Sequence, residues 1–224
     1  YLLLLLLLLA TVAFSHPGRT AVTAPTMSFD FPDTVAKWQK VELGADGSFS
    51  CDAFVDASYA LIKIFDCLNG MGTVKKDMLG NADKICVHMK VTPGLTLQEM
   101  ITKEVTEGFK GDATKAAKKS DSITCATLWL KRALRLVVGM LKHLLEDPSL
   151  SLKDCVKKGY EEGLRAHHNM VTAGVVKGAM SMCPSRATFM EKLGGSEADK
   201  EENLKTLVPM LTECICSKLH TFLL

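Results

Sequence analysis

From about Ser50 onward, apolar residues return at intervals of three and four along the chain. This spacing places them on one face of an α-helix, whereas a half-buried strand needs an alternation that no stretch sustains. We therefore predict an all-α fold, with Gly, Pro and Asn-Gly as stop signals between the helices. The predicted helices cover residues 51–68, 74–89, 122–145, 152–182 and 185–193, with another beginning near Thr96 and the last running from Ser196 to the end.

Two of these helices carry further signals. The helix over 122–145 is apolar around most of its circumference and stops at Asp147-Pro148, which is typical of a central, buried helix. In the last helix, Ser196 and Asp199 have the spacing of a capping box, and we expect Pro209 to introduce a kink.

The first residues have a different composition. Residues 2–14 form an apolar run that is too short to cross a bilayer, since a membrane helix needs ~20 residues. The run has two open interpretations, the apolar region of a signal peptide that lacks its charged start, or translated upstream sequence. We divide the chain into a leader or upstream segment with its linker (1–26), an N-terminal extension (27–49) and one main domain (50–224).

The overall composition is that of a soluble globular domain. The chain is 47% hydrophobic, and 27 basic residues nearly balance 25 acidic ones, for a net charge of +2. This balance argues against nucleic-acid binding and leaves weak attraction to an anionic membrane surface open. The eight cysteines form no C-x-x-C pair, so we expect reduced thiols and no metal site. We further expect a cytoplasmic monomer. A genuine signal peptide over residues 1–15 would instead indicate the secretory pathway.

No catalytic motif stands out in the sequence. H-E-x-x-H, G-x-S-x-G and a phosphate loop ending in G-K-[ST] are all missing. We therefore expect no enzyme and no cofactor, and a helical shell around an apolar interior favours a container for a ligand.

A few polar and aromatic residues are candidates for ligand binding. Asp77, Asn81 and Lys84 fall at i, i+4 and i+7, on one helix face, and could bind the hydroxyls of a sugar or simply face solvent. Trp129 is compatible with a core position or with stacking against a sugar ring. His168 is compatible with a satisfied core histidine or with a donor to a ligand carbonyl.

These residues occur in strings that resemble the glycolipid transfer protein family. The strings are D-x-x-G-N-x-x-K-I over residues 77–85, W-L-K-R-x-L-R over 129–135, the first-helix segment 54–68, Thr96-Leu97-Gln98, and Tyr160-Glu161 with His168. The resemblance spans about residues 50–215. It implies a two-layer helical sandwich with a tunnel for ceramide chains and a headgroup held at its mouth.

The resemblance also implies a role for each residue. Asp77 is expected to bind the ceramide amide and sugar hydroxyls, and Asn81 and Lys84 the sugar. Trp129 is expected to stack on the sugar, and His168 to donate to the acyl carbonyl. The implied function is non-enzymatic transfer of glycosphingolipids, with transient contact to a membrane surface.

The sequence departs from the family pattern in ways that keep alternatives open. Met170 stands where the family has a membrane-docking tryptophan, and His167 where an aromatic residue is common. The ceramide-1-phosphate branch carries Lys or Arg at the positions of Asn81 and Trp129, which favours a glycolipid here. Arg132 and Arg135 are nevertheless possible phosphate contacts. A sphingolipid sensor or scaffold that transfers nothing is a further alternative.

Overall fold

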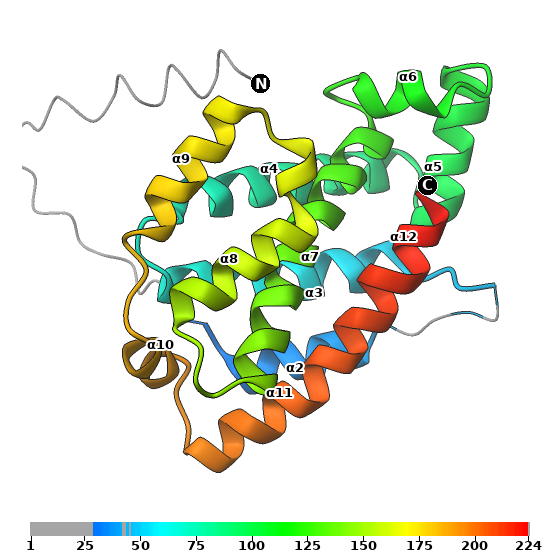
Figure 1. Ribbon diagram of the computed structural model, residues 1–224. Coiled ribbons are helices and arrows are strands. Elements are labelled where there is room, and N and C mark those ends of the chain that lie inside the picture. The colour runs from blue at the N-terminus through cyan, green and yellow to red at the C-terminus, as the bar shows by residue number, and fades with distance from the viewer. Residues whose placement is uncertain (1–28, 42–43, 45, 224) are drawn as a thin grey trace, which may run out of the picture.

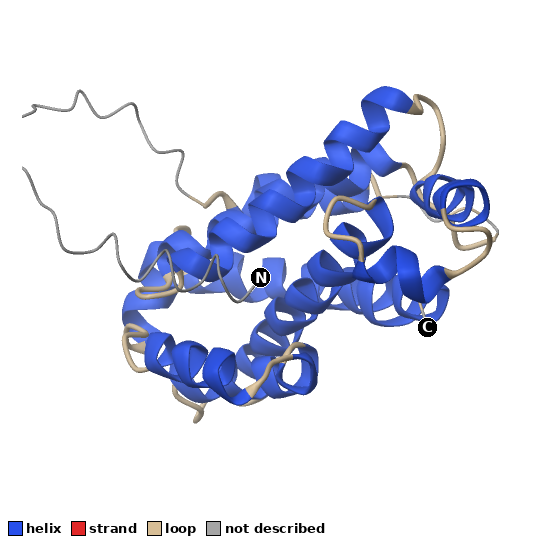
Figure 2. Ribbon diagram, turned by 90° about the horizontal axis from the view of Figure 1, so that it is seen from above, coloured by secondary structure: helices blue, strands red, loops and turns tan. Residues whose placement is uncertain are grey.

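A computed structural model describes residues 29–41, 44 and 46–223, so the predicted leader at 1–26 lies outside the described residues. Every regular element within them is helical, which confirms the all-α prediction (Figure 1). The α-helices are α2 (Phe31–Gln39), α3 (Cys51–Ile62), α4 (Gly72–Val91), α5 (Leu97–Lys103), α6 (Ala113–Lys118), α7 (Ile123–Glu146), α8 (Leu152–Gly163), α9 (Met170–Met180), α10 (Arg186–Lys192), α11 (Glu197–Leu211) and α12 (Leu219–Phe222). The helices lie in two layers (Figure 2).

Helix α7 is the central element of the fold. It packs against α4, α8 and α11, and most of its residues are buried, as its apolar circumference predicted. Its start is capped twice: Ser122 Oγ accepts from the Cys125 amide at 2.9 Å, and the Glu104 carboxylate accepts from the Thr124 amide at 3.0 Å. These bonds satisfy amides that the first helical turn leaves without partners.

The contact between α7 and α8 is made by glycines. A Cβ on Gly159 would lie 2.3 Å from the carbonyl oxygen of Leu136, and one on Gly163 would lie 2.6 Å from the Leu136 amide nitrogen. Gly139 of α7 faces Gly159 directly, since a Cβ there would lie 2.7 Å from the Gly159 Cα. The two backbones therefore touch, and only glycine fits at the crossing.

The sequence pattern did not reveal helix α2. It begins after Asp30, whose Oδ1 accepts from the Asp33 amide at 2.9 Å, and it packs against α3 and α11. Trp38 is 2% exposed and meets Phe54 edge-on, with ring centroids 6.1 Å apart. Residues from Phe29 onward therefore share the core of the main domain.

The predicted helix over 152–182 is broken in the structure. Helix α8 ends at Gly163, the 3₁₀ turn η4 (Arg165–His167) follows, and Asn169 caps α9 by accepting from the Thr172 amide at 2.9 Å. The break follows from the α7 contact, which fixes the end of α8 at its glycine, and from the Asn169 side chain, which starts a new helix. Position 168 consequently lies on extended backbone instead of on a helix face.

Other helix limits agree with the sequence more closely. Ser196 forms the predicted capping box, and a helix starts at Thr96 as predicted, with a capping box that was not predicted. The helix predicted over 74–89 extends from Gly72 to Val91. The segment predicted as one helix over 51–68 becomes α3 followed by the 3₁₀ helix η2 (Lys63–Cys67). The π-helical segments were not predicted; they are η3 (Glu104–Gly108) and η5 (Thr212–Lys218). Pro209 lies inside α11, which continues to Leu211.

The eight cysteines are all thiols, without a disulfide among them. Burial raises the pKa of Cys51 and of Cys214 to about 12, so that neither forms a thiolate readily at neutral pH. Of the described helices, none combines the length and apolar character that a membrane crossing needs.

Candidate functional site

The predicted polar row on α4 is present in the structure. Asn81 is 2% exposed although it is polar, and its Nδ2 donates to the backbone carbonyl oxygen of Asp77 at 3.0 Å and to Asp77 Oδ2 at 3.3 Å. Lys84 lies close enough to stabilise the Asp77 carboxylate electrostatically. The structure therefore brings these three residues together, as their i, i+4, i+7 spacing predicted.

The Asp77 carboxylate is accessible to solvent but is not fully hydrated. The protein packed around it raises its pKa, and Lys84 and the Asn81 amide oppose this effect without outweighing it. Such a carboxylate has lost part of its water and has gained incomplete compensation from the protein. A ligand that donates hydrogen bonds would supply the missing compensation.

Aromatic rings from α7, α8 and the turn before α9 form the second part of the site. The His168 ring stacks beside Trp129, with centroids 6.2 Å apart and planes inclined by 23°. The Tyr160 hydroxyl lies 3.2 Å from His168 Nδ1, and Arg165 Nη1 donates to the His168 carbonyl oxygen at 3.3 Å. His168 is thus oriented through its ring and through its backbone.

The environment of His168 keeps its imidazole neutral. Burial lowers its pKa below the ordinary value of 6.5, and the nearby Arg165 lowers it further. A neutral imidazole has one donor and one acceptor nitrogen. When the Tyr160 hydroxyl donates to Nδ1, the proton lies on Nε2, which is then a donor for a ligand carbonyl.

Trp129 also contacts a cation from its own helix. The Arg132 guanidinium carbon lies 5.0 Å from the centroid of the indole ring, which is cation–π geometry. Arg135, the other predicted phosphate contact, has a different neighbour, because it lies close enough to the Cys216 thiol in η5 to oppose the rise of its pKa. Arg132 therefore lies against the Trp129 ring, and Arg135 lies near η5.

Packing between α4 and α7 brings the polar row and the aromatic group into one neighbourhood. The thiol of Cys125 on α7 lies near both groups. Burial raises the pKa of this thiol, while the charges of Lys84 from α4 and Arg132 from α7 oppose the rise. One helix thus contributes carboxylate, amide and ammonium groups, and the other contributes an indole and a guanidinium. The combination can bind a ligand with hydroxyl and amide groups.

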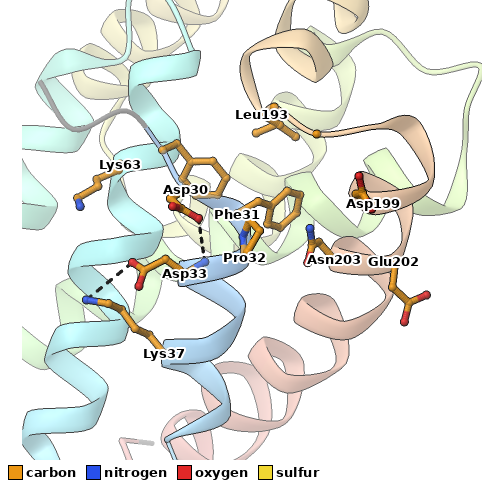
Figure 3. A pocket seen from close by; sticks show the side chains of 13 residues that line it. Asp30, Phe31, Pro32, Asp33, Lys37, Lys63, Leu193, Asp199, Glu202 and Asn203 are labelled. Atoms are coloured by element: carbon orange, nitrogen blue, oxygen red, sulfur yellow. Dashed lines mark hydrogen bonds and ion pairs between the residues drawn. The ribbon is translucent and has the colours of Figure 1, made fainter.

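A cavity of about 900 Å³ lies in a different part of the molecule (Figure 3). It opens between the start of α2 and the turn before α11, where Asp30, Phe31, Leu193 and Asn203 are among its lining residues. None of the residues predicted to bind a headgroup lines it. A ligand held by Asp77 would therefore bind away from this cavity.

Comparison with known proteins decides the family. The sequence model described as glycolipid transfer protein matches residues 49–195, which is more than half of the chain. The chain belongs to the glycolipid transfer protein family. The pleckstrin homology domain-containing family A member 8 of Danio rerio is 32% identical to it over 189 residues, which is 81% of this chain and 31% of that protein. The chain spans about a third of the length of such relatives, since the rat protein is likewise covered over 37%.

Solved structures agree with the family fold. The crystal structure of HET-C2, a fungal glycolipid transfer protein, is 27% identical with a TM-score of 0.73, covering 86% of this chain and 96% of that one. Human ceramide-1-phosphate transfer protein, in complex with 12:0 ceramide-1-phosphate, has a TM-score of 0.72 at 18% identity, covering 88% and 99%. The second likeness shows the fold alone, and together they confirm the two-layer architecture of the glycolipid transfer protein family.

Sequence reasoning missed several residues that the structure places beside the predicted ones. Tyr160 stands in a matched string, but eight residues and a turn separate it from His168, so helical spacing does not connect them. Arg165 contacts the backbone of His168, for which the sequence holds no signal. Lys131 and His220 are brought near each other by the docking of the chain end on α7, a long-range contact that no local pattern reports.

Proposed function

We propose that this chain binds a glycosphingolipid and carries it between membranes without catalysing bond chemistry. The observation that carries the proposal is the hydrogen-bonded pair Asp77 and Asn81, with Lys84, in the same neighbourhood as Trp129 and His168. These groups have the chemistry that a sugar and a ceramide amide need for binding. They also occur in the order along the chain that is typical of this family.

Each proposed role follows from the chemistry of the side chain. The Asp77 carboxylate accepts from the ceramide amide and a sugar hydroxyl, and a ligand in this place restores its lost hydration. Asn81 and Lys84 add donors for the remaining hydroxyls. The Trp129 indole offers an apolar face to the sugar ring, and neutral His168 donates to the acyl carbonyl.

The hydrocarbon chains supply affinity but little discrimination. Burial of a lipid chain contributes ~0.8 kcal/mol per CH₂ whatever the headgroup is. The chains would enter the apolar core, and only the polar groups at the surface can tell one headgroup from another. We therefore assign headgroup selection to the five residues above.

Transient membrane contact is part of the proposal. Met170 and Val171, at the start of α9, are 86% and 62% exposed, and they lie two and three residues beyond His168. Apolar side chains exposed this close to a lipid-binding residue are suited to touch a membrane during uptake. We take the carrier to be a cytoplasmic monomer, which sedimentation of the full chain and cell fractionation would check.

A vesicle assay tests the transfer. Donor vesicles that contain a fluorescent monohexosylceramide are mixed with unlabelled acceptor vesicles, with and without the full chain. We expect transfer well above spontaneous exchange. Lipid binding without faster transfer would contradict the carrier and support a sensor, and absence of binding would contradict the proposal altogether.

A ceramide-1-phosphate ligand is the second candidate, favoured by the guanidinium of Arg132 at 5.0 Å from the Trp129 ring centroid. Competition between a monohexosylceramide and ceramide-1-phosphate separates the two. We expect the wild-type chain to prefer the glycolipid, and Asn81→Lys with Trp129→Arg to shift the preference toward the phosphate. Equal binding, or a wild-type preference for ceramide-1-phosphate, would contradict the glycolipid assignment.

A further inference from the structure

Lys131, next to the headgroup residues on α7, is buried without a counter-ion. Its side chain is 3% exposed, and it makes no hydrogen bond or ion pair with any residue that the structure describes. Burial, together with the nearby positive charges of Arg132 and Arg135, lowers its pKa to about 8. At neutral pH most of the molecules still carry this positive charge.

Other donors gather around the same place. Arg135 follows Lys131 by four residues and so lies on the same face of α7. From α12, His220 has a buried Nδ1 with no hydrogen-bond partner among the described residues. Burial lowers the pKa of His220, and Lys131 and Arg135 contribute to the lowering. Burial also lowers the pKa of His167 in η4, and the charges of Arg132, Lys131 and Arg135 contribute to the lowering.

The acidic groups nearby do not neutralise this cluster. Glu162 lies near the Cys216 thiol, whose pKa it raises. Its Oε1 is already paired with His143 Nε2 at 2.7 Å. No acidic side chain acts on Lys131 itself. An ammonium without a counter-ion, on a residue that is 3% exposed and beside two guanidinium groups, is unfavourable, because partial loss of hydration strengthens the repulsion between the charges.

We propose that Lys131, Arg135 and His220 bind an oxyanion of the phosphate or sulfate class between α7 and the chain end. An ammonium and a guanidinium fork from α7 and an imidazole N–H from α12 supply hydrogen-bond donors that suit the oxygens of a tetrahedral oxyanion. Cations repel a metal ion, so the same cluster is unsuited to one. The site does not depend on glycolipid transfer, although its oxyanion has two sources, a lipid headgroup or free phosphate.

Thermal unfolding of the full chain in phosphate tests the site. Inorganic phosphate is titrated against chloride at equal ionic strength. We expect the melting temperature to rise with saturation, by about 3–5 °C at ten times the dissociation constant. Lys131→Met should lose this rise and, without phosphate, melt at least as high as wild type, because it removes an unpaired buried charge. Lys118→Met, at an exposed lysine at the end of α6, is the matched control and should keep the rise.

A second measurement uses only the wild-type chain, so its outcome does not depend on whether Lys131→Met folds. The imidazole of His220 is followed by nuclear magnetic resonance while phosphate is added, and the bound oxyanion should raise its pKa. Phosphate that acts no differently from chloride in both experiments, or a rise that persists in Lys131→Met, would overturn the proposal.

Lipid binding distinguishes the two sources. If the oxyanion belongs to a lipid, Lys131→Met should weaken binding of a short-chain ceramide-1-phosphate about tenfold and leave a neutral monohexosylceramide unaffected. If it is free phosphate, the rise in melting temperature should persist at saturating monohexosylceramide. Both results support the site and identify its occupant. Wild-type phosphate binding without the tenfold loss of ceramide-1-phosphate binding in Lys131→Met, and without a rise that persists at saturating monohexosylceramide, would show that the anion does not lie in the cluster.

Discussion

Helix α7 is built differently on its two sides. Toward α8, glycines bring the two backbones into direct contact, with Gly139 facing Gly159 and no side chain between them. Toward α4 and η4, side chains fill the space, and they are polar, partly desolvated and incompletely paired. The first side has one possible packing, whereas the second has groups that a ligand can complete.

The difference teaches where stability and binding are separable. Direct backbone contact tolerates no added atom, so changes there act on the folded state as a whole. An incompletely compensated carboxylate stabilises the empty protein little, so its removal should act on the ligand. Variants on the two sides of one helix should therefore affect different measurements.

The largest effect is expected at the glycine contact. Gly159→Ala places a Cβ 2.3 Å from the Leu136 carbonyl oxygen, where backbone cannot yield, and should lower the free energy of unfolding by about 3 kcal/mol. Chemical denaturation followed by circular dichroism measures it. Gly178→Ala in α9, where a Cβ meets nothing within 4 Å, is the control and should be neutral or stabilising by ~0.5–1 kcal/mol. Similar stability of both variants would contradict the close contact.

Asp77→Val should separate binding from folding. We expect glycolipid transfer to fall at least tenfold, since one or two lost hydrogen bonds contribute ~1–3 kcal/mol each. The free energy of unfolding should stay within about 1 kcal/mol of wild type. Vesicle transfer and denaturation are measured on the same preparation. Glu191→Val, at an exposed carboxylate of α10, should change neither. Loss of helical signal in Asp77→Val at room temperature would show that Asp77 is structural.

A spectroscopic change of moderate size should locate the ligand. The chain has two tryptophans, and Trp38 is 2% exposed, so a bound headgroup should shift mainly the emission of half-buried Trp129 toward the blue. Trp38→Phe isolates this signal. A shift that survives in Trp129→Phe would place the ligand elsewhere.

The smallest expected effect concerns pH. The pKa of folded His168 lies below its ordinary 6.5, so as the pH falls below that value the unfolded chain takes up more protons at this position. The stability that neutral His168 contributes is thus present above pH ~6.5 and is lost toward acid. Melting temperatures from pH 7.5 to 5.5 should fall less steeply in His168→Gln than in wild type. Equal slopes would contradict burial of His168.

Local signals predicted much of this fold. The helix start at Thr96, the capping box at Ser196 and the buried circumference of α7 formed as expected, because each depends on residues close in sequence. The break after Gly163 could not be predicted in this way, because this glycine packs against the backbone of Leu136 in another helix, where a Cβ does not fit. The burial of α2 likewise depends on contacts with α3 and α11.

The site was predictable only in part for the same reason. Asp77, Asn81 and Lys84 share one helix, so spacing placed them together. Trp129 and His168 meet across a turn, and the family resemblance, not periodicity, connected them. The different partners of Arg132 and Arg135 depend on the side of α7 that each occupies and on the chain end that docks there.

The π-helical segment η5 sets the rotational phase of the end of the chain. A π-helix has a wider turn than an α-helix, so it holds an inserted residue without breaking the helical path. Beyond it, Leu219 is fully buried and the next residue is His220 with its buried Nδ1. Deleting one residue within Thr212–Lys218 would let the segment close into ordinary α-helix while Leu219 and His220 keep their orientation, whereas the same deletion within regular α-helix would turn everything after it by ~100°. The segment can therefore lose one residue without moving Leu219 out of the core or His220 away from α7.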